Sequence, residues 1–224
     1  MYLTRENPVD IIGDTCRRLD VENGPGTNLK IWGDWCEEEP PNPAHPHIVA
    51  WVKEQAAQGL HPFVVVDSLI AFFDGQNEND SAEMRAFINQ GRILLRAGAC
   101  GVLFLHHPGK SENSKVYRGS SDLKPAIDAA FYLSNTSDDG RLQRLYLKSW
   151  KRRAIKQRHE LVLHYTETDG KGTFTVDERP IAPVQTMGAQ LRKRCWPTIP
   201  VLPRRNSKRR RRLSICLATG HGCL

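Results

Sequence analysis

Two short apolar segments, residues 62–66 and 101–105, constrain the possible fold of this chain more than any other feature. Both lack the alternation of polar and apolar residues that marks a half-exposed strand, and this composition is typical of strands covered on both faces of a parallel sheet. The segment between them starts with a capping box, Asp80 and Glu83, and then keeps its apolar residues at single-face helical spacing. A strand, a crossover helix and a second strand predict a right-handed βαβ unit, and therefore an α/β fold.

Polar side chains follow each of these predicted strands. Asp67 comes directly after the first strand, and His106 and His107 follow the second. Because ligands of open α/β sheets bind beyond the carboxyl ends of the strands, we expect these residues at one rim of the sheet. A carboxylate there can hold Mg²⁺, although it can also simply cap the next turn. A neutral imidazole there can hydrogen-bond to a phosphate or to a polarised water, although a lone histidine is more often structural.

Two further polar positions fit a nucleotide site. Arg118 lies in the loop sequence RGSS, and a guanidinium beside a glycine can bind a phosphate with two hydrogen bonds while staying charged at any physiological pH. Glu6 lies between a short strand at the start of the chain and a predicted helix, for which Asn7 is expected as the N-cap and Pro8 as the first residue. A carboxylate at such a turn serves either as a cap or as a base.

Four segments, in this order, carry a resemblance to a known family: YLTRENP, PFVVVDSL, VLFLHHPGK and RGSSDLKPAIDAAFYL, all within residues 1–150. They resemble the RecA-like ATPases, and most closely the plasmid and phage replicative helicases of the RepA type. The resemblance implies a RecA-like, mostly parallel sheet flanked by helices, with ATP and Mg²⁺ as cofactors. It also implies single-stranded DNA as a partner and a homo-oligomeric ring, expected to be a hexamer.

The resemblance assigns a role to each polar residue named above. Asp67 would be the Walker B acid that holds Mg²⁺, and His106 or His107 would be the phosphate sensor. Arg118 would be the arginine finger. Glu6 would be the catalytic glutamate that orients the attacking water.

One motif of that family is not found in these 224 residues, namely the phosphate-binding loop G-x-x-x-x-G-K-[ST]. The nearest partial match is PGKS at residues 108–111, where the first glycine of the motif would have to stand at Phe104. Phenylalanine cannot supply the positive φ or the close backbone approach that the loop requires. We therefore expect a RecA-like domain that lacks its first strand, P-loop and following helix, and that binds ATP very weakly by itself.

The C-terminal half of residues 1–184 predicts hairpins. Apolar or β-branched runs at residues 131–133, 141–149, 160–165 and 173–176 are separated by turns rich in Asp, Gly and Ser, and such hairpins add antiparallel strands to the edge of a sheet. Lys148 lies in a basic cluster where related hexameric ATPases place residues that reach a neighbour's γ-phosphate or single-stranded DNA. The alternative for Lys148 is that it simply lies on a solvated edge strand. Ser68, next to the predicted Walker B acid, is another expected nucleotide contact.

The charge of +7 is unevenly distributed, and it predicts a division into two regions. Residues 1–184, the predicted ATPase core, hold 25 acids and 22 bases, whereas residues 185–224 hold 10 bases and no acid. Such a basic, Pro-containing segment predicts a disordered tail that binds nucleic acid with strong salt dependence. The alternative is a non-native extension, such as a shifted reading frame.

Two functions fit these features. The first is the motor domain of a RepA-like replicative DNA helicase, impaired by the missing P-loop. The second is a non-catalytic nucleic-acid-binding or assembly protein that keeps the fold. The sequence has no C-x-x-C pair, signal peptide or long apolar run, so we expect neither zinc nor a membrane partner, and a cytoplasmic location.

Overall fold

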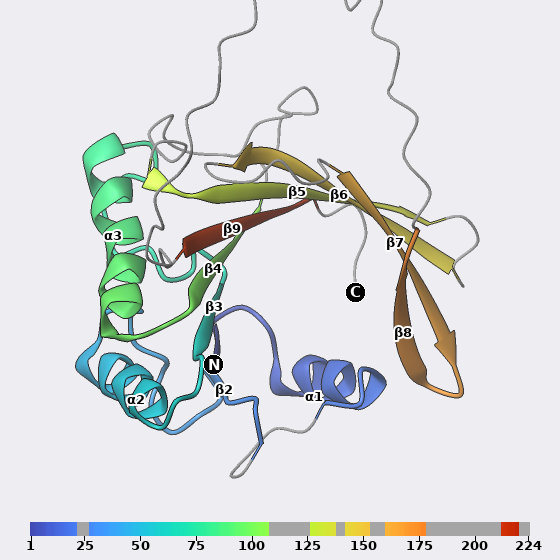
Figure 1. Cartoon of the computed structure of the whole chain (residues 1–224), viewed down its shortest axis with the longest axis horizontal. Helices are drawn as coiled ribbons and strands as arrows, with labels where there is room; N and C mark the ends of the chain where they lie inside the picture. Colours follow the sequence, from blue (N-terminus) through green and yellow to red (C-terminus); the bar gives the residue numbers. More distant parts are fainter. Residues whose placement is uncertain (22–26, 108–125, 138–141, 153–159, 178–211, 220–224) are drawn as a thin grey trace, which may run out of the picture. The chain divides into compact units, whose positions relative to one another are not determined.

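A computed structural model describes residues 1–21, 27–107, 126–137, 142–152, 160–177 and 212–219. This part of the chain contains the helices α1 (Val9–Arg18), α2 (Pro46–Ala57) and α3 (Ser81–Ala97). Its strands form one sheet in the order β2-β1-β3-β4-β9-β5-β6-β7-β8 (Figure 1). Their bounds are β1 (Tyr2–Thr4), β2 (Ile31–Gly33), β3 (Phe63–Asp67), β4 (Gly101–His106), β5 (Ala129–Ser137), β6 (Leu142–Arg152), β7 (Glu160–Thr168), β8 (Lys171–Val176) and β9 (Arg212–Thr219).

The first four strands of the sheet, β2-β1-β3-β4, are all parallel. Thr4 pairs with Asp67, and Val66 pairs with Phe104, so the carboxyl ends of β1, β3 and β4 lie level with one another. The predicted unit of strand, crossover helix and strand is β3, α3 and β4. The expectation of a parallel sheet flanked by helices is therefore confirmed.

The other end of the sheet is antiparallel. β5 pairs with β6, β6 with β7, and β7 with β8, each in antiparallel register. These are the hairpins that the turn-rich sequence predicts, so the expectation of antiparallel edge strands is also confirmed.

One strand was not expected. Arg212–Thr219, within the segment predicted as a disordered basic tail, forms β9 and lies parallel to both of its neighbours, β4 and β5. After the run of basic residues, this segment contains Leu213, Ile215 and Leu217 at alternate positions, which is the spacing of a strand. The rest of the predicted tail, and the predicted division at residue 184, lie outside the described residues.

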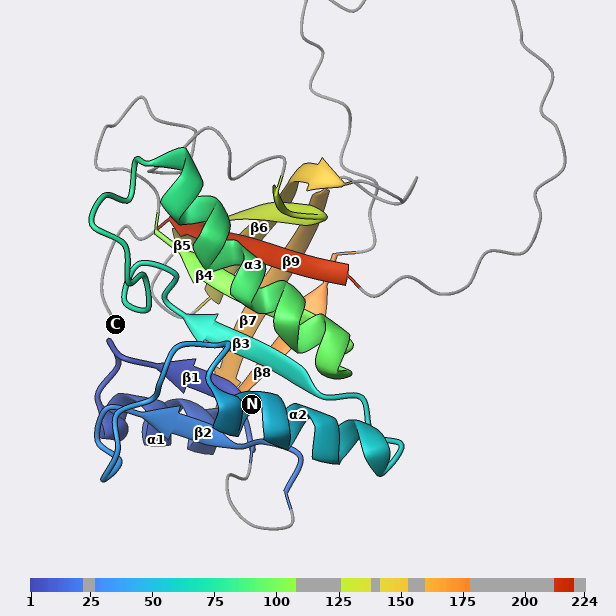
Figure 2. The ribbon, with the colours of Figure 1, turned by 90° about the vertical axis from the view of Figure 1, so that its left-hand side faces the viewer.

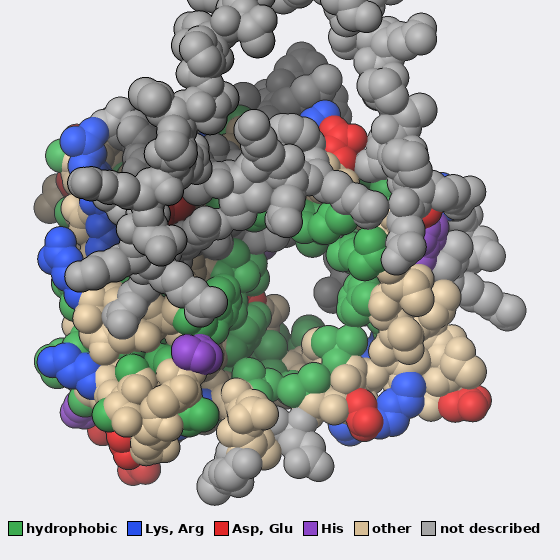
Figure 3. All heavy atoms as spheres, viewed as in Figure 1, with side chains coloured by type: hydrophobic (Ala, Val, Ile, Leu, Met, Phe, Trp, Pro, Cys, Tyr) green, Lys and Arg blue, Asp and Glu red, His purple; other side chains and the backbone are tan. Residues whose placement is uncertain are grey.

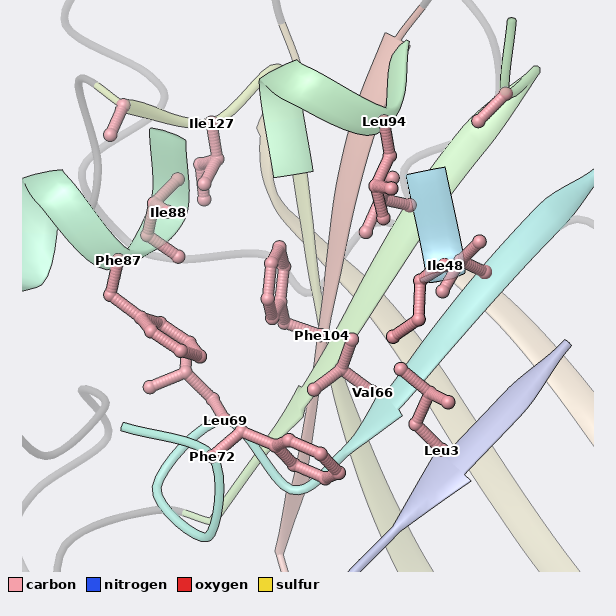
Figure 4. Packing of buried hydrophobic residues seen from close by; sticks show 14 of the residues in the cluster. Leu3, Ile48, Val66, Leu69, Phe72, Phe87, Ile88, Leu94, Phe104 and Ile127 are labelled. Carbon is pink, nitrogen blue, oxygen red and sulfur yellow. The ribbon is translucent and has the colours of Figure 1, made fainter. Parts of the chain in front are cut away.

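Helices α2 and α3 cover the same face of the sheet (Figure 2). The residues of β1, β3 and β4 that point to this face are fully buried, among them Leu3, Val66 and Phe104. The ring of Phe104 meets the ring of Phe87 from α3 at a centroid distance of 5.7 Å, and Ile48 of α2 completes the same layer (Figure 4). This is the hydrophobic core.

The opposite face of the parallel strands is less covered. Val65, Leu103 and Leu105, which alternate with the core residues, are only half-buried. Helix α1 lies over β1 and β2 on this side, and none of its residues is fully buried. Hydrophobic side chains accordingly line a hollow in the space-filling view (Figure 3).

The ends of α3 follow from the sequence. The carboxylate of Asp80 accepts hydrogen bonds from the backbone N–H groups of Ala82 (2.8 Å) and Glu83 (2.9 Å), which confirms the predicted N-cap. Gly98 ends the helix with φ of 129°, a conformation that strongly favours glycine. The helix therefore returns the chain to β4 beside β3.

Within the described ranges, no helix has both the length and the apolar composition needed to cross a membrane.

Replacing Phe104 with leucine is expected to lower the free energy of unfolding by about 1–2 kcal/mol, because it leaves a void beside Phe87. Urea denaturation followed by circular dichroism measures this loss. Phe63→Leu on the neighbouring strand is the control, since Phe63 is 41% exposed and should lose much less. Equal losses in the two variants would show that the core is not centred on Phe104.

Candidate active site at the carboxyl edge of the parallel strands

Asp67 is the last residue of β3, and its side chain is almost completely buried. Tyr2 of β1 is on the same side of the sheet, because Tyr2 pairs with Val65 and residues two apart on a strand share a face. The Tyr2 hydroxyl donates a hydrogen bond to Asp67 Oδ2. The side-chain amide of Asn7 donates to the same oxygen, with a distance of 2.8 Å from Nδ2 to Oδ2. The carboxylate is therefore held at the rim by two donors.

The turn that carries Glu6 is fixed to the end of β3. The hydroxyl of Thr4, which is fully buried, accepts hydrogen bonds from the backbone N–H groups of Glu6 (3.4 Å) and Asn7 (3.3 Å). The backbone N–H of Arg5 donates to the carbonyl of Asp67 at 3.3 Å. These bonds place Glu6 next to Asp67 although about 60 residues separate them in sequence.

The prediction that Asn7 is the N-cap of α1 is wrong. The N-cap is Pro8, which has no side-chain hydrogen bond to the helix, and α1 begins at Val9. The Asn7 amide instead donates to Asp67 and, at 3.4 Å, to the hydroxyl of Thr4. Asn7 thus bonds to two residues of the sheet, Thr4 and Asp67, instead of capping the helix.

Glu6 faces His107, the first residue after β4. Glu6 Oε2 lies 3.3 Å from His107 Nε2, which is within hydrogen-bond distance. Both side chains are accessible, with 39% of Glu6 and 63% of His107 exposed. The carboxylate and the imidazole can therefore both reach a bound ligand.

His106 does not join this group. Side chains alternate along β4, so His106 shares the face of Phe104, which is the face covered by α2 and α3, and it is 1% exposed. The sequence left open which histidine faces the site. The structure places His107 beside Glu6 and His106 on the core side.

Burial and neighbouring charge affect the ionisation of this cluster. Burial raises the pKa of Asp67 above its usual value, and the nearby Glu6 carboxylate raises it further, whereas the hydrogen bond from Tyr2 opposes the shift. Burial also raises the pKa of the Tyr2 phenol, and the Asp67 carboxylate adds to the effect. Tyr2 therefore remains a hydrogen-bond donor throughout the physiological pH range.

Arg5, between Thr4 and Glu6, fixes the loops around the site. Its guanidinium donates to the carbonyls of Pro40 (3.0 and 2.7 Å) and Ala71 (3.2 Å), and it stacks on the ring of Phe72 at 4.4 Å. These contacts join the loop that follows β2 and the turn that follows β3 to the end of β1. Arg5 therefore has a structural role, since its guanidinium is already bonded to these loops.

The remaining predicted site residues lie apart from this cluster or outside the described ranges. Ser68 is fully buried, and its hydroxyl accepts a bond from the N–H of Ala71 at 3.5 Å, within the turn that follows β3. Lys148 lies on β6, which β9 and β5 separate from β4, and its ammonium pairs with Glu160 at 3.0 Å. Arg118 lies outside the described residues.

The carboxylate of Asp67 is a suitable ligand for Mg²⁺. No group of three or more His, Cys, Asp or Glu side chains within the described ranges could enclose a metal ion. A single buried carboxylate suits Mg²⁺, which keeps several waters and completes its octahedron with substrate phosphates. It does not suit zinc, whose protein sites combine three or four side-chain ligands.

A cavity elsewhere in the described structure does not coincide with this cluster. It has a volume of about 480 Å³ and lies between α1 and the β7–β8 hairpin, where Ile11, Leu19 and Phe174 contribute apolar walls. None of Glu6, Asp67 and His107 lines it. The two indicators of a site therefore disagree: the titratable side chains lie together at the rim of the sheet, whereas the cavity lies beside α1. We place the candidate site at the rim, where the titratable groups are close together.

The first half of the chain matches a known protein family. Residues 1–113, just over half of the chain, match a family described as AAA domain, and this range includes Glu6, Asp67 and His107. A search of curated proteins gave no match. The chain, an ATPase-like domain, belongs to this AAA domain family.

Proposed function

We propose that the chain is the hydrolytic part of the motor domain of a RepA-type replicative DNA helicase. The observation that carries the proposal is the contact between Glu6 and His107 beside the buried carboxylate of Asp67, at the ends of three adjacent parallel strands. In this assignment Asp67 is the Walker B acid, and His107 is the phosphate sensor.

The proposed roles of Glu6 and Asp67 follow from how exposed each side chain is. Glu6 is accessible and can orient a water molecule. The contact with His107 Nε2 keeps the Glu6 carboxylate in place. Asp67 is buried and would hold Mg²⁺ through a carboxylate oxygen. Mg²⁺ bound there supplies charge neutralisation for the phosphates of ATP.

A phosphate-binding loop completes the proposal. The 224 residues contain no G-x-x-x-x-G-K-[ST] sequence. We therefore propose that a segment other than these residues carries the motif and supplies the backbone N–H groups and the lysine that bind the phosphates. Arg118 is proposed as an arginine finger that acts on the nucleotide of a neighbouring subunit, which requires a homo-oligomeric ring, expected to be a hexamer. Single-stranded DNA is the proposed track.

The test uses a completed chain, defined as the 224 residues fused behind a strand, P-loop and helix of a RepA-type helicase. The fusion keeps a hydrogen on the Met1 nitrogen, which donates to the carbonyl of Phe63 at 2.8 Å. We expect ATP hydrolysis that single-stranded DNA stimulates, and only very weak ATP binding by the unfused chain. Micromolar ATP affinity of the unfused chain in isothermal titration, or no hydrolysis after completion, would contradict the proposal.

Binding of nucleic acid without catalysis is a second candidate, favoured by the 10 bases and the absence of acids in the sequence of residues 185–224. Replacing Lys208, Arg209, Arg210 and Arg211 with glutamine should weaken single-stranded DNA binding at low salt. The slope of log K against log salt should become shallower by up to about 0.7 for each phosphate that these side chains no longer neutralise. Fluorescence anisotropy across a salt series measures both quantities.

The matched control removes the same number of charges from other parts of the chain, at Arg17, Lys30, Lys53 and Arg96. It should leave the salt slope unchanged. If the control makes the slope as shallow as the tail variant does, binding depends on total charge and the tail has no special part in it.

A further inference from the structure

The two oxygens of the Asp67 carboxylate have different surroundings. Oδ2 accepts both the Tyr2 hydroxyl and the Asn7 amide. Among the described residues, no donor is paired with Oδ1. Two donors on one oxygen leave the other as the oxygen that a cation can take.

Both donors are fixed by bonds of their own. Tyr2 lies in β1, where its backbone pairs with Val65 of β3. The Asn7 amide also donates to Thr4 Oγ1 at 3.4 Å, and the backbone N–H of Asn7 donates to the same oxygen at 3.3 Å. The carboxylate therefore cannot turn to present both of its oxygens without breaking hydrogen bonds in a buried environment.

The number of available oxygens matters because cations differ in the carboxylate geometry they accept. Mg²⁺ requires a nearly ideal octahedron with short bonds, and one oxygen per carboxylate suits it. Ca²⁺ takes more ligands at longer distances and readily binds a carboxylate through both oxygens. A carboxylate with one oxygen already occupied thus disfavours Ca²⁺ more than Mg²⁺.

We propose that Tyr2 and Asn7 are positioning residues that make Asp67 a one-oxygen ligand and thereby set the cation selectivity of the site in favour of Mg²⁺ over Ca²⁺. The inference rests on the proposed function, because it requires Asp67 to hold the cation. It adds two residues to which neither the sequence motifs nor the family match gives a role in cation binding.

The full 224-residue chain, Mn²⁺ as a paramagnetic probe and NMR spectroscopy test the inference without ATP turnover. Mn²⁺ should broaden the amide signals of Ser68 and Leu69, and Mg²⁺ should reverse the broadening at a lower concentration than Ca²⁺. In Tyr2→Phe and Asn7→Ala, the ratio of the Ca²⁺ to the Mg²⁺ concentration needed should fall about tenfold, the lower end of the effect of removing a partner of a metal ligand. A merely structural role would weaken both cations alike and leave the ratio unchanged.

Asn42→Ala is the matched control, because Asn42 Nδ2 donates to the carboxylate of Asp74 at 2.6 Å and that pair lies outside the cluster. It should leave the ratio unchanged. Tyr2→Phe removes only a hydroxyl, so it keeps the test valid if Asn7→Ala unfolds. Broadening that Asp67→Asn abolishes, together with an unchanged ratio in Tyr2→Phe, overturns the inference and leaves the cation site intact. If Mn²⁺ broadens no signal near Asp67 in the wild type, Asp67 does not hold a cation by itself and the inference is wrong.

Discussion

The completed chain with Glu6→Gln is expected to hydrolyse ATP about 10²–10⁴ times more slowly than the completed wild type, which is the usual contribution of a positioned proton acceptor. Glutamine keeps the size of the side chain and can still hydrogen-bond to His107, but it lacks the negative charge that orients and polarises water. Because Glu6 is not expected to bind the nucleotide itself, ATP affinity should change little. A coupled assay of phosphate release and an equilibrium titration measure the two quantities separately.

Glu37→Gln is the control for this experiment, because Glu37 is a glutamate outside the cluster. It should hydrolyse ATP at the wild-type rate. A Glu6→Gln chain that keeps full turnover would remove Glu6 from the chemistry, whatever its distance to His107.

Asp67→Asn should change activity and stability in opposite directions. Hydrolysis by the completed chain should fall at least about 10²-fold, since the amide loses the charge that holds the cation. The free energy of unfolding of the unfused chain should rise at neutral pH by about 1 kcal/mol, since the variant no longer buries a carboxylate whose pKa is raised by desolvation. The amide oxygen of asparagine can still accept the bonds from Tyr2 and Asn7.

The pH dependence of this gain has a definite sign. Because the pKa of Asp67 is higher in the folded state than the usual 3.8, the folded chain binds the proton more tightly than the unfolded chain. The wild type therefore loses stability as the pH rises from about 3.8 through the raised folded pKa, and the gain from Asp67→Asn should vanish below that interval. Denaturation of wild type and variant between acidic and neutral pH measures the difference. Asp74→Asn, which alters a carboxylate outside the cluster, should show no such gain.

Much of the framework could be predicted from the sequence because the relevant signals are local. The apolar runs of β3 and β4, the helical spacing of α3 and its cap at Asp80 each reflect a preference of neighbouring residues. Asp67 at the end of β3 then follows, because parallel strands bring their carboxyl ends to the same edge.

The rest depended on contacts between distant residues. Asn7 has the sequence signature of an N-cap, and only the register of β1 against β3 shows that its amide meets Asp67. The sequence could not show which of His106 and His107 faces the site, because residues 101–105 are continuously apolar and do not reveal which of them point to the core. The role of Tyr2 had no local signal, since an aromatic residue in a short strand more often packs in a core.

The parallel position of β9 had no local signal either. Residues 212–219 follow a basic run, and their apolar alternation does not say which strands they will join. In the structure β9 pairs with β4 on one side and with β5 on the other, and these two strands are consecutive along the chain but not paired with each other.

The most direct test of the central claim is a crystal structure of the completed chain with Mn²⁺ and a non-hydrolysable ATP analogue, with the anomalous signal used to locate the cation. The claim predicts a Mn²⁺ peak beside Asp67 Oδ1, bound directly or through one water, with the terminal phosphate facing Glu6 and His107. A cation and nucleotide bound elsewhere, with Glu6, Asp67 and His107 facing only solvent, would contradict it.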